Sequence, residues 1–193
     1  SYGSTARNDF GPSIMQVLGP DDSNLWLQRT QSAIGQKVEL QPRGRPDVQF
    51  IFAPAQPATA RLLRPQLRFH LAGAGQGDIP TFTLGDAYEP HPTANQEIEG
   101  VMFPDMPWML GDEGLSGEVR QLADEAFGDS PSRRGRLFAF GYDAFRIASS
   151  LQRNRTVDPR GLTGTLSLDD QGRVRRDVPW VRIKSGGPEP LGR

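Results

Sequence analysis

Residues 48–84 carry the pattern that decides the fold: VQFIFAPAQPATARLLRPQLRFHLAGAGQGDIPTFTL. Residues 48–52 are nearly continuously apolar, which is typical of a central parallel strand covered on both faces. A helix capped by Thr59 then carries leucines at 62, 63, 67 and 71, and Pro65 predicts a bend within it. Residues 79–84 predict a second strand. Strand, helix and strand in this order indicate a βαβ unit with a right-handed crossover.

The sequence before this unit predicts two helices and a strand. Apolar residues between positions 14 and 18 suit a short amphipathic helix. A second helix is expected to carry Trp26 and Ile34 on one side and to end at Gly35, since glycine is favoured just beyond helix ends. Residues 37–40 then predict a short strand.

The middle of the chain indicates a division. Residues 88–95 form a polar connection that contains two prolines, which predicts a lobe boundary near residues 88–100. Residues 101–103 predict a strand that ends at Pro104, because proline has no N–H for a strand ladder.

Two helices and a hairpin are expected after this division. Helices are predicted over residues 116–127 and 137–151, from apolar residues at helical spacing. The second helix has an apolar stripe that needs a partner surface: Phe140, Ala144, Ile147, Ala148 and Leu151. Residues 164–168 and 173–183 predict a β-hairpin whose turn places Gly172 at a positive φ.

Composition excludes several classes of function. A chain of 193 residues and 21.2 kDa allows one domain or two small lobes. Its 22 basic and 23 acidic residues and its pI of about 6.1 argue against a nucleic-acid binder, which needs a basic excess. The absence of cysteine excludes a disulfide, a thiolate metal site and a thiol nucleophile within the chain. No apolar run approaches the ~20 residues of a membrane span.

No motif indicates catalysis, a metal or a cofactor. The sequence has neither the G-x-S-x-G elbow nor the S-x-x-K of acyl transfer, and its two histidines lack a second ligand at i+4 spacing. Neighbouring carboxylates at 97 and 99, and at 169 and 170, are more typical of turns than of an acid and base pair. The glycines at 73–77 follow a helix and enter a strand, which favours a flexible αβ loop over a phosphate-binding loop.

Two regions are candidates for recognition. Residues 103–108 read FPDMPW, where two prolines fix the backbone around an aromatic side chain and a carboxylate, as in a packed hinge or a shaped binding surface. Basic clusters lie at residues 133–136 and 173–176. Solvated loop and hairpin faces explain these clusters, with an acidic protein partner or an anionic glycan as alternatives.

Short motifs run in order over nearly the whole chain. They are RPDVQFIFA at 45–53, ARLLRPQL at 60–67, AG at 72–73, DIP at 78–80, DAY at 86–88, FPDMPW at 103–108, GLTGTLSL at 161–168, RR at 175–176 and Trp180. Together they resemble the LpoA (LppC) family of outer-membrane lipoproteins. Residues 74–77 depart from the family pattern, because they look inserted between its Ala-Gly and Asp-Ile-Pro motifs.

The resemblance implies an α/β fold. It implies Rossmann-like lobes with a parallel sheet flanked by helices, as in type I periplasmic binding proteins, and a C-terminal β-hairpin. Residues 1–193 would form part of the family's C-terminal domain, following a helical-repeat domain absent from this sequence. Residues 1–90 would belong to the second lobe, and residues 91–193 would return to the first lobe and end in the hairpin.

The resemblance also implies a function without chemistry. Family members are implied to lie in the periplasm, attached to the outer membrane by a lipid anchor that would lie outside this sequence. They are implied to bind and activate a class A penicillin-binding protein and so promote peptidoglycan synthesis. An alternative from another class is a periplasmic solute-binding or sensor lobe for a small molecule, and a second is an enzyme. The candidate binding residues are Tyr88, Asp105, Trp108, Arg173, Arg175 and Arg176.

Overall fold

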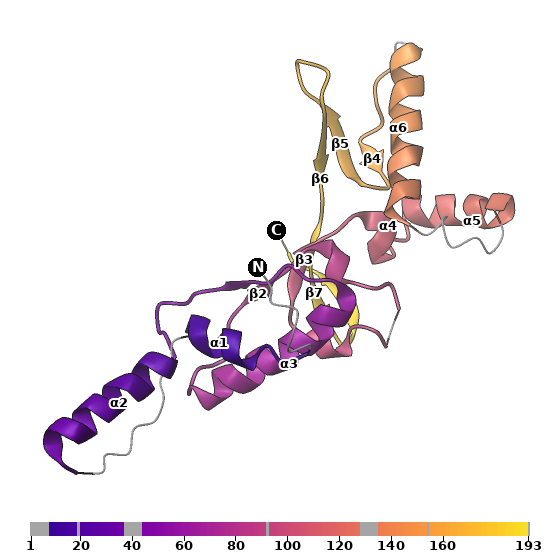
Figure 1. Cartoon of the computed structure of the whole chain (residues 1–193). Helices are drawn as coiled ribbons and strands as arrows, with labels where there is room; N and C mark the ends of the chain where they lie inside the picture. The colour runs from indigo at the N-terminus through magenta and orange to yellow at the C-terminus, as the bar shows by residue number, and fades with distance from the viewer. Residues whose placement is uncertain are drawn as a thin grey trace. The chain divides into compact units, whose positions relative to one another are not determined.

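The computed structural model describes residues 8–18, 20–36, 44–91, 93–127, 135–153 and 155–192. The chain forms two compact units, which Figure 1 shows with their helices and strands. Unit 1 comprises Ser1–Met102 and Ile183–Gly187, and unit 2 comprises Phe103–Arg182 and Pro188–Arg193. The division falls just beyond the expected boundary region of 88–100. The correspondence of these units to two lobes stays a prediction.

Unit 1 contains the expected βαβ arrangement. Strand β1 (Ile51–Phe52) is followed by helix α3 (Pro57–Gly73) and strand β2 (Thr81–Phe82). The two strands pair in parallel, and β2 pairs in parallel with β3 (Met102–Pro104), so the predicted βαβ unit is confirmed. The strand order of this sheet is β1-β2-β3-β7-β8, where β7 is Trp180–Lys184 and β8 is Gly187–Pro190. Of these last two strands, only residues 183–184 and Gly187 are assigned to unit 1.

The prediction that residues 48–52 form a central strand covered on both faces is wrong. Strand β1 stands at the end of the order of described strands. Successive side chains of a strand point to opposite faces, so Ile51 packs on the core of unit 1 while Phe50 and Phe52 are 61% and 56% exposed. In this chain, the apolar run at residues 48–52 therefore marks a strand with only one buried face.

Two helices build the core of unit 1. Helix α1 (Gly11–Leu18) confirms the short amphipathic helix, and it packs with α3 through a buried cluster. The cluster contains Ile14, Leu18, Leu67, Leu71 and Ile79. Helix α3 begins at Pro57, ahead of the expected cap, because a proline without an N–H is well placed in a first helical turn. Two short 3₁₀ helices, η1 (Gly85–Ala87) and η2 (Gln96–Ile98), follow β2.

Helix α2 (Pro20–Ile34) follows α1 and ends where expected, with Gly35 at a φ of +70°. Trp26 and Ile34 are both 57% exposed. The strand predicted over residues 37–40 lies outside the described residues. None of the helices within the described ranges is long and apolar enough to cross a membrane.

Unit 2 is built on three helices. Helix α4 (Pro107–Leu110) precedes α5 (Leu115–Phe127) and α6 (Arg136–Gln152), which confirms the helices predicted over 116–127 and 137–151. Its core cluster contains Trp108, Met109, Val119, Ala139 and Leu162. Of the apolar stripe predicted on α6, Ile147 is buried, whereas Phe140 and Leu151 are each 50% exposed.

A three-stranded antiparallel sheet completes unit 2. Its strands are β4 (Arg160–Gly161), β5 (Gly164–Leu168) and β6 (Val174–Asp177). The turn between β5 and β6 has Gly172 at a φ of +73°, as predicted. The expected extension of the hairpin to residue 183 is wrong, since β6 ends at Asp177 and β7 belongs to the other sheet. Pro179, which has no N–H to donate, lies between the two strands.

Candidate functional site

The FPDMPW segment is a fixed turn between β3 and α4. Met106 caps the start of α4 with an extended backbone, and Pro107 is its first residue, where a missing N–H costs nothing. Helix α4 ends at Gly111, whose φ of +81° is the left-handed conformation that glycine adopts freely. Pro107 thus determines where α4 begins and Gly111 where it ends. The backbone conformation that results orients the side chains of Asp105 and Trp108.

Asp105 is buried beside a cation. One carboxylate oxygen accepts a hydrogen bond from an Arg136 guanidinium nitrogen at 2.6 Å, and the other accepts the backbone N–H of Met106 at 2.8 Å. The Asp105 side chain is 4% exposed and that of Arg136 is 32% exposed. This carboxylate ties the start of α4 to the start of α6.

Trp108 is the aromatic anchor of the core of unit 2. Its ring centroid lies 5.1 Å from that of Phe138, and the Arg120 guanidinium lies 4.8 Å from the indole centroid. Arg120 also donates a hydrogen bond to the Trp108 backbone carbonyl, and the backbone N–H of Trp108 donates to the Leu162 carbonyl at 3.1 Å. With 3% of the residue exposed, the ring is covered by its own chain.

Tyr88 lies in unit 1, immediately after η1. Its backbone N–H donates to the Gly85 carbonyl at 3.0 Å, and the residue is 7% exposed. Asp105 and Trp108 belong to unit 2. The solute-binding alternative would be favoured by a polar pocket lined by Tyr88, Asp105 and Trp108, and that pocket stays a prediction. Each of the three residues is held in this structure by packing within its own unit.

The tip of the hairpin gathers exposed arginines around one carboxylate. Asp169 accepts the backbone N–H groups of Arg173 and Gln171 at 2.9 and 3.0 Å, and the Arg173 Nε at 2.8 Å. These donors, with the Arg173 N–H first, lower the pKa of the Asp169 carboxyl. Arg175 Nε lies 3.7 Å from the same carboxylate, and the Arg173 and Arg175 side chains are 66% and 70% exposed.

Arg176 lies on the opposite face of the hairpin. It pairs across the strands with the buried Leu166, and its guanidinium lies 4.9 Å from the ring centroid of Phe140 on α6. A cation over an aromatic face is stabilised by the ring quadrupole. The hairpin therefore presents positive charge on both faces. Residues 133 and 134 of the other basic cluster lie outside the described residues, and its third arginine, Arg136, pairs with Asp105.

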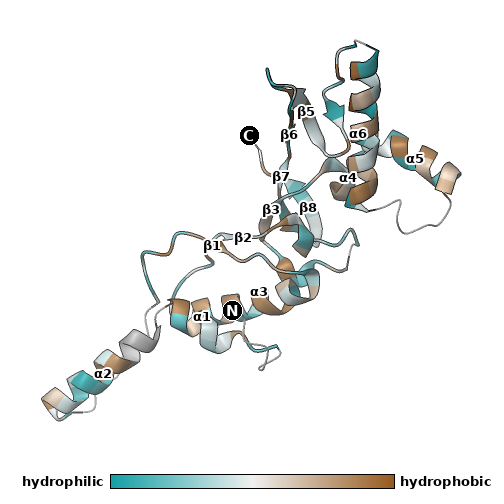
Figure 2. Ribbon diagram, turned by 45° about the horizontal axis from the view of Figure 1, so that its top comes forward, coloured by the Kyte–Doolittle hydropathy of each residue, from teal (hydrophilic) through white to brown (hydrophobic). Residues whose placement is uncertain are grey.

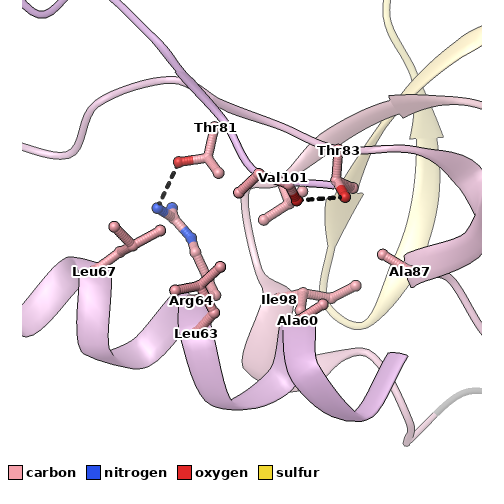
Figure 3. A pocket seen from close by; sticks show the side chains of 10 residues that line it. Ala60, Leu63, Arg64, Leu67, Thr81, Thr83, Ala87, Ile98 and Val101 are labelled. Carbon is pink, nitrogen blue, oxygen red and sulfur yellow. Dashed lines mark hydrogen bonds between the residues drawn. The ribbon is translucent and has the colours of Figure 1, made fainter. Parts of the chain in front are cut away.

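A buried arginine that the sequence analysis missed lies between α3 and the parallel strands (Figure 3). Arg64 is 3% exposed, and its guanidinium donates to both carboxylate oxygens of Asp78 at 3.0 and 2.7 Å and to the Thr81 hydroxyl at 3.1 Å. The adjoining cavity measures about 20 Å³, which holds about one water molecule and no metabolite. The sequence signal that could have revealed the burial of Arg64 is its position among the apolar residues of the buried face of α3.

Two of the four carboxylates considered for catalysis, Glu99 and Asp169, accept hydrogen bonds from backbone N–H groups. Glu99 accepts the backbone N–H groups of Ser185 and Gly186 at 3.1 and 3.4 Å, and so holds the loop between β7 and β8. Asp169 holds the hairpin turn in the same way.

Solved structures show the class of protein that this architecture defines. The LpoA (YraM) C-domain from Haemophilus influenzae, described as a regulator of PBP1A, has a TM-score of 0.54 at 23% identity, covering 90% of this chain and 49% of that one. A structure described as "a putative branched-chain amino acid ABC transporter" from Rhodospirillum rubrum has a TM-score of 0.56 at 19% identity, covering 74% and 44%. The chain is a mixed α/β protein with the fold of type I periplasmic binding proteins, as predicted.

The sequence narrows that class to one family. The family described as "LppC putative lipoprotein" matches residues 5–186, so the chain belongs to the LppC family and the predicted resemblance is confirmed. Penicillin-binding protein activator LpoA of Photobacterium profundum is 28% identical over 191 residues, or 96% of this chain. The protein of that name from Vibrio cholerae is 24% identical over 177 residues, or 88%. The chain spans 30% and 28% of the lengths of these relatives.

Proposed function

We propose that this chain is a non-catalytic domain that binds and activates a class A penicillin-binding protein, and so regulates peptidoglycan synthesis. The single observation that supports this most strongly is the family match over residues 5–186, with relatives named as activators of a penicillin-binding protein. The protein would work in the periplasm, held at the outer membrane by a lipid anchor outside this chain. The two units would be the second lobe and the chain's return to the first.

The contacts of the titratable residues support docking in place of chemistry. Asp105, Glu99 and Asp169 all accept hydrogen bonds from backbone N–H groups, and these bonds fix turns of the chain. A domain whose carboxylates hold turns of its own backbone can still present a shaped and charged surface to a partner. Such a surface is sufficient for an activator that acts by binding, provided that it binds the active state of its partner more tightly than the inactive state.

The arginines of the hairpin are the members of the candidate set that a partner reaches directly. Arg173 and Arg175 project from the turn with about two thirds of each side chain exposed. Asp105 and Trp108 are buried, so they would support a docking surface from beneath. An exposed cluster of guanidinium groups favours an acidic patch on the synthase, because opposite charges raise the rate of encounter and fix orientation.

A binding measurement with charge-reversed variants tests this proposal. Arg175→Glu combined with Arg176→Glu should weaken binding of the purified synthase by about tenfold or more and reduce its dependence on salt. The matched control is Arg29→Glu combined with Arg68→Glu, which reverses two charges at exposed positions of α2 and α3 in unit 1. Binding by the hairpin variant that equals binding by the control would remove the hairpin from the docking surface. A chain that binds no class A synthase at all would contradict the proposed function itself.

A further inference from the structure

Strand β6 stands at the edge of the small sheet in unit 2. The strand order is β4-β5-β6, so β6 pairs with β5 on one side, and none of the described strands pairs with its other side (Figure 1). Its pairing with β5 runs without a bulge from Leu168↔Val174 to Thr165↔Asp177. An edge strand presents backbone N–H and C=O groups that can pair with another chain. Strand β6 is therefore a template for one further strand.

One hydrogen bond at the end of the ladder shows which backbone groups of β6 face β5. The N–H of Asp169 donates to the carbonyl of Arg173 at 3.0 Å. Facing residues in an antiparallel ladder alternate between pairs that exchange hydrogen bonds and pairs that do not. Because Arg175 and Asp177 continue the alternation from Arg173, they direct their N–H and C=O groups toward β5.

The backbone groups of Val174 and Arg176 consequently point away from β5, toward the open edge. The hydrogen bonds on the far side of β5 agree with this alternation, because the N–H of Leu166, which faces Arg176, donates to the Pro159 carbonyl at 2.7 Å. Among the described residues, no hydrogen bond outside the strand ladder reaches the backbone of Val174 or Arg176. Each of these two residues thus offers one N–H and one C=O group to an added strand.

The side chains along this edge are mostly charged, and the tip of the hairpin is hydrophilic (Figure 2). Arg175 is 70% exposed on the outward face, and Arg176 lies on the other face, with its guanidinium 4.9 Å from the ring centroid of Phe140. The Asp169 side chain lies 3.7 Å from Arg175 but is only 13% exposed. Asp177 is exposed at the end of the strand. The edge therefore presents two adjacent cations followed by one anion.

We propose that β6 receives an extended segment of a protein partner as an added strand. Two adjacent acidic residues of that segment lie opposite Arg175 and Arg176, and an uncharged or basic residue lies opposite Asp177. Backbone hydrogen bonds to Val174 and Arg176 supply the affinity, and the paired side chains supply the selectivity. Side chains of unlike charge stabilise a strand pair when they are directly opposed, and like charges destabilise it. This inference rests on the proposed function, in which the segment belongs to the class A penicillin-binding protein.

The chemistry of the edge disfavours other occupants. Charged residues on an edge strand oppose pairing with an apolar strand. Two copies of β6 paired about a two-fold axis centred on Arg175 or Arg176 would place arginine directly opposite arginine. An anionic glycan could contact the guanidinium groups, but it has no regular row of N–H and C=O groups that matches the backbone of β6. An acidic polypeptide satisfies both the backbone and the side chains.

Amide hydrogen exchange tests the added strand residue by residue. Exchange is measured by NMR on this chain, alone and with a large excess of the synthetic peptide Thr-Lys-Glu-Glu-Val-Thr. In an antiparallel alignment, its glutamates lie opposite Arg175 and Arg176 and its lysine lies opposite Asp177. The amides of Val174 and Arg176 should exchange about tenfold or more slowly with the peptide, because they become hydrogen-bonded, whereas those of Arg175 and Asp177 should change little. The control peptide Thr-Glu-Lys-Lys-Val-Thr, in which the charges are reversed, should protect none of them.

Methylated peptides separate backbone pairing from attraction between side chains, and they leave the protein unchanged. In the proposed alignment, the first glutamate and the valine direct their N–H groups toward β6, whereas the lysine and the second glutamate direct theirs away. N-methylation of the first pair should abolish the protection of Val174 and Arg176, and N-methylation of the second pair should preserve it. Equal binding by both methylated peptides would overturn the proposal, because contact through side chains alone, as by an anionic glycan, would explain it.

A pair of variants extends the test to the synthase. Arg176→Pro and Arg176→Val both remove the cation, but only the first removes the outward N–H. Proline is tolerated at such a position of an edge strand, and unfolding midpoints check that both variants fold. Arg176→Pro should bind the purified synthase about fivefold or more weakly than Arg176→Val, because a hydrogen bond to the added strand is lost.

Failure of this inference and failure of the proposed function give different results. Equal binding of the synthase by Arg176→Pro and Arg176→Val would overturn the added strand and leave the proposed function standing. Protection of Val174 and Arg176 by the acidic peptide, without binding of any class A synthase, would contradict the proposed function and support the added strand. Unchanged exchange of both amides with the peptide in large excess would overturn the inference. Protection that rises with the concentration of the chain alone would also overturn it, and would identify a second copy as the added strand.

Discussion

Among the described helices, α3 in unit 1 and α6 in unit 2 are the longest, with 17 residues each. Each places one ionisable side chain in the middle of its buried face, and the two side chains find different kinds of partner. Arg64 of α3 meets the carboxylate of Asp78, which is 51% exposed. Asp143 of α6 is fully buried, and its carboxylate oxygens accept hydrogen bonds from backbone N–H groups.

The Asp143 carboxylate accepts three hydrogen bonds from one turn. They come from the backbone N–H groups of Leu162 and Thr163 at 3.0 and 2.8 Å and from the Thr163 hydroxyl at 2.7 Å. Two consecutive N–H groups and a hydroxyl replace the hydration that burial removes. Helix α3 thus holds the segment that leads into β2 through a side-chain pair with Asp78, whereas α6 holds the turn between β4 and β5 through backbone N–H groups.

The largest effect is expected from Asp143→Ala. Removal of the carboxylate leaves three buried donors without an acceptor, so the free energy of unfolding of unit 2 should fall by about 3 kcal/mol or more. Urea denaturation followed by tryptophan fluorescence measures this, since Trp108 lies in the core of unit 2. Asp143→Asn keeps one carbonyl oxygen as an acceptor, so it should lower the free energy of unfolding by less than Asp143→Ala does. An Asp143→Ala variant as stable as the parent would show that the turn does not depend on α6.

A smaller loss is expected from Arg64→Met. The cation is buried, but its partner Asp78 is half exposed and is hydrated when the pair is broken, so about 2 kcal/mol should be lost. Arg64→Lys should recover little, because an ammonium group cannot reproduce the two-point contact with the carboxylate. Thermal unfolding with the Asp143 variants in parallel compares the units. A loss at Arg64 that exceeds the loss at Asp143 would reverse the comparison.

Two glycine substitutions separate backbone strain from packing. Gly172→Ala should destabilise the hairpin by about 1 kcal/mol, because alanine is strained at its φ of +73° although nothing lies within 4 Å of an added Cβ. Gly73→Ala, at the end of α3, meets equally open space without a positive φ, and it should be neutral or stabilising by about 0.5 kcal/mol. Differential scanning calorimetry distinguishes the two. Equal effects would contradict the assignment of strain to Gly172.

The smallest effect concerns Asp158. Hydrogen bonds from the Arg160 side chain, then from its backbone N–H, lower the pKa of this carboxyl from 3.8 to about 2. The folded state thus prefers the ionised form, and its stabilisation is present above pH 3.8 and lost as the pH falls through about 2. Asp158→Asn should cost less than about 1 kcal/mol at pH 7, since exposed ion pairs are screened. The gap between variant and parent should narrow in melts at pH 2, where about half of the folded molecules carry the protonated carboxyl, and a gap that widens there would exclude this cause.

The sequence predicted the positions of helices and strands better than it predicted which of their faces are buried. Apolar runs and helical spacing located β1, α3, β2 and α6, because these signals are local. The predicted stripe on α6 shared only Ile147 with the buried face, since Asp143 interrupts the apolar pattern there, and its members Phe140 and Leu151 are half exposed. In the same way, the run at residues 48–52 could not reveal that Phe50 and Phe52 are exposed, because exposure depends on which neighbours are present.

The candidate site was predictable only in part. The turn residues of FPDMPW indicated a rigid segment, and the hairpin turn indicated where its arginines gather. No local pattern could show that Trp108 is enclosed by Phe138 and Arg120, which come from two other helices. Burial of that kind depends on tertiary packing, which also explains why the role of Arg64 was missed.

The proposed function is that this domain acts by binding a synthase, and the rate of peptidoglycan synthesis by a purified class A penicillin-binding protein measures that action. The rate is determined with and without this protein, and again with the Arg175→Glu and Arg176→Glu double variant. We expect a faster rate with the parent protein, and a stimulation that the double variant reaches only at about tenfold higher concentration or more. A rate that the parent protein leaves unchanged at saturating concentration would contradict the account.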